Sequence, residues 1–411
     1  MEIVLYLSIL VVIIFLCFHF TKTFSIESFI LVYMSLWCLS SIIISLTQGW
    51  YISIASYFIH IIFALSFCTS ALFIRKRCVT YEFRVCSPKR LNYFFSYFNF
   101  LGLIGLLHHV SQFGFNLNLY EIAQQASISR YNNENVSSIQ ILTSSFIFCN
   151  FFILGFCSKK DIKTKNKLIL IFIILFLSIL TSSKANLIIS LTFFIAGCFN
   201  KFVLTGYKFT YSVKSKLLTR SIMASAVAFA FLVLLQTLRY GVDNFSWAIV
   251  DRMLVYAFGQ FSAFSIWFDK TSIEYMDLGL GYGLFTGLYS RVLGIERIFG
   301  FYDTFTYISG TDYTNVFSLS RLIISDFTFL GGCVFLFLVG IVWRVIYKGT
   351  KRLTTVIFFL TCISVESFFG FGTSILSYNN VILAIFLILL VFNFNFKYFE
   401  SAKNESFKNT H

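Results

Sequence analysis

The sequence predicts an all-α polytopic integral membrane protein with about eleven transmembrane helices, within a range of about ten to twelve. Of its 411 residues, 58% are hydrophobic and only 12% are charged, and there is a single proline. Apolar stretches of roughly 20 residues, the length needed to cross a bilayer core about 30 Å thick, recur from Glu2 to Phe396. Soluble globular domains do not have this balance, so we expect the bilayer to be the main solvent of the fold.

The predicted spans are joined by short connectors except in two places. They cover residues 3–20, 28–46, 51–74, 91–110, 138–157, 168–183, 185–200, 221–238, 322–347, 353–373 and 380–396. We interpret the first as a retained helix, because no basic residue precedes it and no small-residue cleavage site follows it. The two spans around Lys184 are short, so a tight helical hairpin and a re-entrant pair both fit them.

Basic residues give these spans a direction, because Lys and Arg are retained on the cytoplasmic side. One alternating set of connectors holds 24 of the 32 Lys and Arg residues, and the other set holds 8. The C-terminus, with a tail at 397–411, is therefore predicted to be cytoplasmic and the N-terminus to lie outside. The net charge of +14 is distributed over these juxtamembrane clusters, so we expect no nucleic-acid partner.

We treat residues 1–411 as a single transmembrane domain with two long outward segments. The first is a polar loop at 111–137, and the second, at 239–321, lies between the eighth and ninth spans. The second contains a predicted helix at 245–268 whose apolar face suits the membrane interface, and a turn-rich stretch at 278–287. All ten cysteines lie in spans or in a basic loop, which predicts neither a disulfide nor a cysteine-based metal site. No metal or cofactor is expected.

The outward side prefers arginine to lysine, in contrast to the rest of the chain. The cytoplasmic set contains 17 Lys and 7 Arg, whereas the outward set contains 2 Lys and 6 Arg. A guanidinium donates two parallel hydrogen bonds to phosphate or carboxylate, which an ammonium cannot match, so this bias favours a phosphorylated or acidic ligand. The alternative is that these arginines form structural bridges with nearby acids. The outward basic residues are Arg130, Lys184, Arg239, Arg252, Lys270, Arg291, Arg297 and Arg321.

Three residues near the outward ends of spans are candidates for proton transfer. Glu366 is the first choice as catalytic acid or base, because a charged carboxylate in lipid costs roughly 2.5–3.5 kcal/mol and so implies a function. His108 and His109 end the fourth span, where an imidazole can act as a general base or simply anchor the helix end. His60, in the middle of the third span, is interpreted as a helix–helix contact.

Aromatic side chains and glycines in the large loop admit two interpretations. The aromatic residues interleaved with Gly and Arg from Tyr282 to Tyr307 suit stacking on sugar rings, but equally suit an interfacial belt. The triplet Gly279, Gly281 and Gly283 lacks the strand context of a nucleotide-binding loop, so nucleotide binding is not predicted.

The tract TNVFSLSRLIISDFTFLGGCVFLFLVG, residues 314–340, resembles the segment leading into a late span of Wzy-type O-antigen polymerases. The matching elements are Thr314, Asn315, Val316, Arg321, Asp326 and Gly331. A second resemblance is the small-residue run that ends at Lys184, where the family commonly has arginine. The layout of spans and loops is similar along nearly the whole chain.

The resemblance implies a membrane architecture like that of the O-antigen ligases and C-type glycosyltransferases. It also implies an enzyme of the bacterial inner membrane that joins undecaprenyl-pyrophosphate-linked oligosaccharide repeat units into O-antigen or capsular polysaccharide at the periplasmic face. Expected partners are the lipid-linked oligosaccharides, membrane lipids, and a chain-length regulator and a flippase of the same pathway. The residues expected to bind substrate or pyrophosphate are Arg130, Tyr131, Lys184, Arg239, Arg252, Arg291, Arg297, Asn315, Arg321 and Asp326.

Three alternatives remain open from the sequence. An O-antigen ligase shares the topology and the leaving group. A lipid-linked oligosaccharide flippase or transporter would be expected to place charges inside its spans and to use short loops. A receptor or scaffold would need a folded soluble domain, and the chain offers none.

Overall fold

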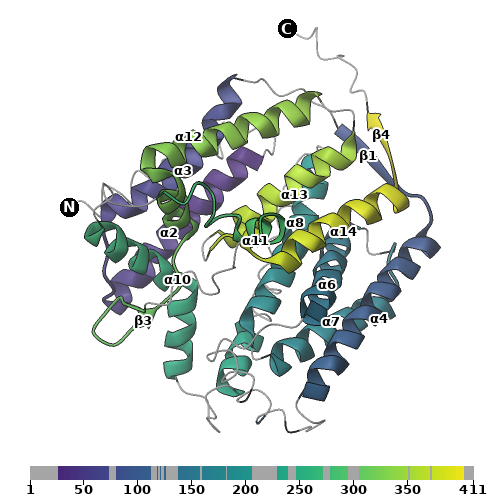
Figure 1. The fold of residues 1–411 in the computed structure, drawn as a ribbon, viewed down its shortest axis with the longest axis horizontal. Helices are drawn as coiled ribbons and strands as arrows, with labels where there is room; N and C mark the ends of the chain where they lie inside the picture. The colour runs from purple at the N-terminus through teal and green to yellow at the C-terminus, as the bar shows by residue number, and fades with distance from the viewer. Residues whose placement is uncertain are drawn as a thin grey trace, which may run out of the picture.

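A computed structural model of the chain shows a bundle of helices with two short β-ladders at its edges (Figure 1). It describes residues 26–73, 80–112, 118, 121, 125, 138–157, 160–181, 183–205, 229–238, 247–271, 278–294, 305–349, 352–370 and 373–401. The predicted first span at 3–20 and the beginning of the span at 221–238 lie outside these residues.

The helices match most of the predicted spans to within a few residues. They are α2 (Ile26–Gln48), α3 (Ile54–Phe73), α4 (Pro88–Gln112), α6 (Ser138–Phe156), α7 (Thr164–Leu180), α8 (Lys184–Thr205), α10 (Trp247–Lys270), α11 (Thr286–Val292), α12 (Leu319–Gly349), α13 (Leu353–Phe369) and α14 (Asn379–Asn395). A short 3-10 helix, η2 (Ile375–Ser377), precedes α14. The two short spans around Lys184 are the helices α7 and α8, separated by three residues.

Five helices in the described part of the chain are long and apolar enough to cross a membrane. They are Phe29–Gln48, Ile54–Phe73, Ser138–Phe156, Lys184–Thr205 and Leu319–Lys348. One face of α12 carries a row of exposed apolar side chains spaced three or four residues apart. They are 44–73% exposed: Leu330, Val334, Leu338, Val342 and Val345. Water would disfavour such a stripe, whereas lipid would solvate it. These features are those of a membrane-embedded helical protein.

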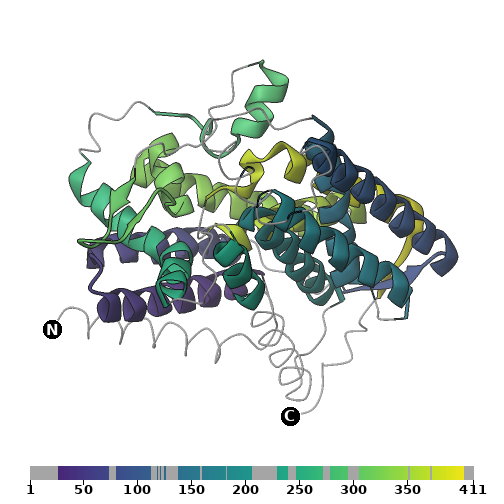
Figure 2. The ribbon, with the colours of Figure 1, turned by 90° about the horizontal axis from the view of Figure 1, so that it is seen from below.

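The helices pack in two groups, which Figure 2 shows from below with α2 and α3 in purple and α4 in blue. One group contains α2, α3, α10 and α12, and the other contains α4, α6, α7, α8, α13 and α14. Within the second group, Gly155 of α6 lies against the carbonyl oxygen of Phe194, and Gly197 of α8 lies against that of Phe152. Glycines at both positions let the two helix backbones approach closely, as is common where small residues meet between membrane helices.

The described part of the chain is mostly helical, as predicted, and it also contains two short β-ladders that the sequence did not predict. Strand β1 (Thr80–Val85) pairs antiparallel with β4 (Phe396–Ser401), and β2 (Thr306–Tyr307) pairs with β3 (Tyr313–Thr314). The first ladder joins the basic loop after α3 to the segment after α14, which Figure 1 shows side by side. These two segments therefore lie on the same side of the bundle, as the charge count predicted.

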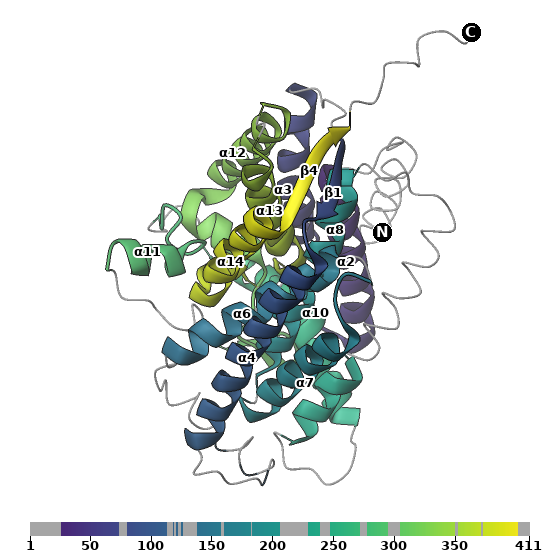
Figure 3. The same cartoon turned by 90° about the vertical axis from the view of Figure 1, so that its right-hand side faces the viewer.

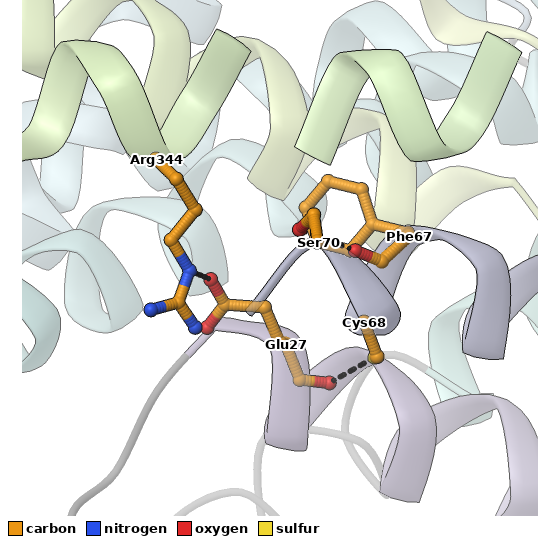
Figure 4. A network of polar contacts seen from close by, with 5 residues as sticks. All are labelled: Glu27, Phe67, Cys68, Ser70 and Arg344. Carbon is orange, nitrogen blue, oxygen red and sulfur yellow. Dashed lines mark hydrogen bonds and ion pairs between the residues drawn. The ribbon is translucent and has the colours of Figure 1, made fainter. Parts of the chain in front are cut away.

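A buried ion pair links the start of α2 to the end of α12. The Nε atom of Arg344 lies 2.6 Å from Oε1 of Glu27, and the two side chains are 8% and 7% exposed. Figure 4 shows this pair beside Cys68, whose thiol donates to the carbonyl oxygen of Glu27 at 3.1 Å. An ion pair this deeply buried fixes the relative position of two helices that are distant in sequence.

The late span differs from a simple helix. Within α12 the backbone at Thr328 has φ 65° and ψ 178°, which divides the helix into a short first part and a long second part. The short part carries Arg321 and Asp326. The helix predicted at 245–268 is present as α10, and one of its faces packs against α2 and α3.

Candidate functional site

The glycine tract at 279–283 wraps around the carboxylate of Asp326. This buried side chain, 2% exposed, accepts hydrogen bonds from the backbone N–H groups of Gly283 at 3.0 Å and Leu284 at 2.9 Å. A Cβ atom at Gly279 would collide with Oδ1 of Asp326, so only glycine fits there. Asp326, which the sequence suggested as a substrate-binding residue, thus fastens a loop, and the glycine triplet has a structural explanation.

The same tract makes a tight turn over the first part of α12. Leu280 and Gly281 have φ angles of 47° and 88°, and the N–H of Tyr282 donates to the carbonyl oxygen of Gly279 at 2.8 Å. Positive φ at both central positions is the signature of a type I′ turn, and it is unfavourable for leucine. The N–H of Leu280 donates to the carbonyl oxygen of Asp326 at 3.0 Å, which holds the turn in place.

Glu366 lies in the last turn of α13, facing the loop that precedes α14. Its Oε2 atom accepts hydrogen bonds from the backbone N–H groups of Ile375 at 3.1 Å and Leu376 at 3.3 Å. Its Oε1 atom is buried and has no hydrogen-bond partner among the described residues. One oxygen therefore fixes the carboxylate, and the other can still accept a proton.

Ser374 joins the loops that hold the two carboxylates. Its hydroxyl donates to the carbonyl oxygen of Leu284 at 2.8 Å, and Leu284 in turn donates its N–H to Asp326. At the ends of the same helices, the N–H of Leu319 donates to the carbonyl oxygen of Gly370 at 2.8 Å. Asp326 and Glu366, both chosen from sequence, thus belong to one connected structure.

Further polar atoms gather where α11 meets η2 and the start of α14. Figure 3 shows α11 projecting from the side of the bundle near α14. In the part of the chain described, the Thr286 hydroxyl and Oδ1 of Asn379 are buried without a hydrogen-bond partner, and Gly287 lies against Asn379. Buried polar atoms normally have partners in protein, water or ligand. These two residues were not foreseen, although the polar break TSILSYNN at 373–380 between two apolar runs signals them.

Two of the predicted basic residues meet at one tyrosine ring. The Nζ atom of Lys184, at the start of α8, lies 3.7 Å from the ring centroid of Tyr256. The guanidinium of Arg252 lies 5.2 Å from the same ring and 4.4 Å from that of Tyr313, whose carbonyl oxygen accepts its hydrogen bond at 2.7 Å. Two cations thus converge from segments far apart in sequence, each over an electron-rich ring face.

Of the other predicted binding residues, some lie in described segments and four lie outside the described residues. Arg321 lies over the rings of Phe317 at 3.9 Å and Trp267 at 5.1 Å, and Asn315 is exposed. Arg291 lies in α11. Arg130, Tyr131, Arg239 and Arg297 are outside the described residues, so their roles stay predictions.

The histidines occupy helix contacts. His109 is buried, with Nε2 at 3.1 Å from the carbonyl oxygen of Leu180 and Nδ1 at 2.5 Å from Nε2 of Gln140. His108 precedes it and is partly buried. His60 contacts the Ser320 hydroxyl at 2.6 Å through Nδ1, which fits its interpretation as a helix–helix contact. Of the proton-transfer candidates, Glu366 keeps one oxygen, Oε1, without a hydrogen bond by distance and angle among the described residues, and the Ser374 hydroxyl lies close to its carboxylate.

Comparison of the chain with protein-family models, curated proteins and solved structures finds no match.

Proposed function

We propose that this protein is a membrane glycosyltransferase that polymerises undecaprenyl-pyrophosphate-linked oligosaccharide repeat units at the periplasmic face of a bacterial inner membrane. The observation that carries the proposal is the meeting of Lys184 and Arg252 at the Tyr256 ring. Converging cations are what a pyrophosphate requires of its binding site, because they stabilise the charge that develops as it leaves.

Glu366 supplies the second part of the chemistry. The hydroxyl oxygen of the acceptor sugar attacks the anomeric carbon of the donor, and the bond from that carbon to the pyrophosphate oxygen breaks. The pyrophosphate departs with the bonding electrons on its polyprenyl carrier, and the hydroxyl proton passes to Oε1 of Glu366. A base of this kind contributes typically about 10²–10⁴-fold to such a step.

The orientation predicted from the charge count supports an outward-facing reaction. Lys184, Arg252 and Glu366 lie at helix ends that the charge count assigns to the periplasm. The β1–β4 ladder and the Glu27–Arg344 pair lie at the opposite ends, where the basic residues cluster. With this orientation, the charge count predicts a periplasmic N-terminus and a cytoplasmic C-terminus.

The test is the length of the surface glycan in cells that carry single substitutions. Lys184→Ala and Arg252→Ala are expected to leave the protein in the membrane at normal abundance while long glycan chains disappear. Arg352→Ala, an exposed arginine at the cytoplasmic start of α13, is the matched control and should retain full-length glycan. Full-length glycan in both outward variants would overturn the proposal.

The same strains distinguish polymerisation from ligation. Loss of a polymerase leaves single repeat units attached to the final acceptor, whereas loss of a ligase leaves finished chains on the lipid carrier. A flippase variant would instead retain repeat units on the cytoplasmic leaflet.

A further inference from the structure

A cavity opens at the end of the bundle that is predicted to face outward, and three segments of the chain form it. Its volume is about 350 Å³, and it is lined by Tyr51, Ile266, Asp269, Lys270, Tyr307, Ile308 and Ser309. Tyr51 lies between α2 and α3, Asp269 and Lys270 end α10, and the last three lie in or after β2. This volume is at the small end of ligand pockets, which range from about 300 to 1,000 Å³.

The walls of this cavity are held together by hydrogen bonds. The N–H of Tyr51 donates to the carbonyl oxygen of Ile308 at 2.9 Å, and the indole N–H of Trp50 donates to Asp312 at 2.9 Å. At the end of α10, Asp269 accepts from the Tyr51 hydroxyl at 2.7 Å and the Ser53 hydroxyl at 3.1 Å. The cavity is thus shaped before any ligand arrives, which lowers the entropic cost of binding.

The lining combines the groups that recognise sugars. Tyr51 and Tyr307 are 46% and 67% exposed, so their rings are accessible for stacking on the C–H faces of a pyranose. Asp269 supplies acceptor oxygens and Lys270 supplies donor N–H groups for hydroxyl groups, while the Ser309 hydroxyl is already hydrogen-bonded to Asp312 at 3.3 Å. The one acid and the one base of the lining offset each other in charge, which suits an uncharged or weakly charged ring better than a phosphate.

The cavity also adjoins the pair of cations. The Tyr307 ring lies 5.7 Å from that of Tyr313 across the β2–β3 hairpin, and Tyr313 contacts Arg252. The hairpin lies beside α10 (Figure 1). A pyrophosphate held near Arg252 would therefore carry its first sugars toward Tyr307.

We propose that this cavity binds one or two pyranose rings of an oligosaccharide, and that Tyr307 is its main stacking residue. That the oligosaccharide is the lipid-linked repeat unit rests on the function proposed above.

The test is calorimetric titration of the full-length protein in lipid nanodiscs. The probe is the free repeat-unit oligosaccharide released by mild acid from the lipid-linked precursor of the producing cells. Tyr307→Ala is expected to raise the Kd roughly tenfold, because the stacking ring is lost. Tyr307→Phe keeps the ring and should retain the wild-type Kd. The matched control is Tyr93→Ala on α4, because Tyr93 is 65% exposed and remote from the cavity.

The outcomes separate this proposal from the polymerase proposal. No binding to the wild type, equal binding to Tyr307→Ala, or binding of inorganic pyrophosphate in its place would overturn the sugar site. If Lys184→Ala loses long glycan while Tyr307→Ala still binds normally, only the sugar site fails. If binding depends on Tyr307 but cells lacking the protein make glycan of normal length, the sugar site stands and the polymerase proposal fails.

Discussion

The hydroxyl of Ser374 donates a hydrogen bond of 2.8 Å to the carbonyl oxygen of Leu284, which joins two loops that are 90 residues apart. One loop supplies the N–H groups that bind Asp326, and the other supplies those that bind Glu366. A movement of either loop therefore disturbs both carboxylates. We expect substitutions at Asp326 to alter the protein through this connection rather than through direct contact with substrate.

Asp326→Asn is expected to loosen the glycine tract. Asp326 uses one oxygen for the N–H of Gly283 and the other for that of Leu284, so an amide NH₂ would face one of these donors. Leaving a buried N–H without an acceptor costs about 1–3 kcal/mol. The measurements are the melting temperature in detergent and hydrogen exchange over 278–285. Asp251→Asn, at an exposed position on α10, is the control, and equal melting of both variants would contradict the interpretation.

Gly279→Ala is expected to destabilise the same region by about 1–3 kcal/mol, because the new methyl group would overlap Oδ1 of Asp326. The matched control is Gly310→Ala, where an added Cβ would have no atom within 4 Å. Thermal unfolding of the two purified variants compares them directly. A Gly279→Ala protein as stable as the Gly310→Ala protein would mean that the tract does not close on Asp326.

The positions of most helices were predictable from the sequence. The residues of the candidate site were predictable only in part. Apolar runs predicted α6 and α14 to within one residue, because the bilayer demands length and hydropathy above all. The strand β1 was missed because its alternating Tyr81, Phe83 and Val85 stand in a basic loop, and its partner begins more than 300 residues later. Long-range pairing of this kind leaves little local signal.

Glu366 was identified because a carboxylate near an apolar helix end is costly and therefore conspicuous, whereas Asp326 was identified only through the resemblance of the tract at 314–340. Their partners were not, since they are backbone N–H groups, and nearly every residue has one. The same limit applies to Lys184 and Arg252. Their charge predicted a role on the outward side, but nothing in the sequence indicated that they would share the ring of Tyr256.

The Glu27–Arg344 pair is expected to stabilise the fold without taking part in the reaction. Replacing Glu27 by leucine leaves the Arg344 guanidinium buried without its carboxylate, which typically costs about 3–5 kcal/mol. The double variant Glu27→Leu with Arg344→Met should recover much of this loss, because two apolar side chains suit the site. Unfolding of the two single variants and the double variant gives the coupling energy. Additive losses would show that the two residues do not interact.

Tyr51→Phe gives a pH-dependent test of the cavity wall. The hydrogen bond to Asp269 raises the pKa of the Tyr51 phenol, so its contribution to stability is fully present below the ordinary tyrosine pKa of about 10. It is lost as the pH rises through the raised pKa. The difference in melting temperature between wild type and Tyr51→Phe should therefore shrink above pH 10. A difference that does not change with pH would rule out this hydrogen bond as its source.

Glu366→Gln is expected to abolish glycan polymerisation without unfolding the protein. The amide oxygen of glutamine can still accept from the N–H groups of Ile375 and Leu376, so the loop before α14 keeps its support. An amide cannot take the proton of an acceptor hydroxyl, however, so the rate should fall by about 10²-fold or more. Glycan length on gels measures the reaction, and melting temperature measures the fold. Normal glycan from a stable Glu366→Gln protein would remove Glu366 from the mechanism, whereas loss of both would assign it a structural role.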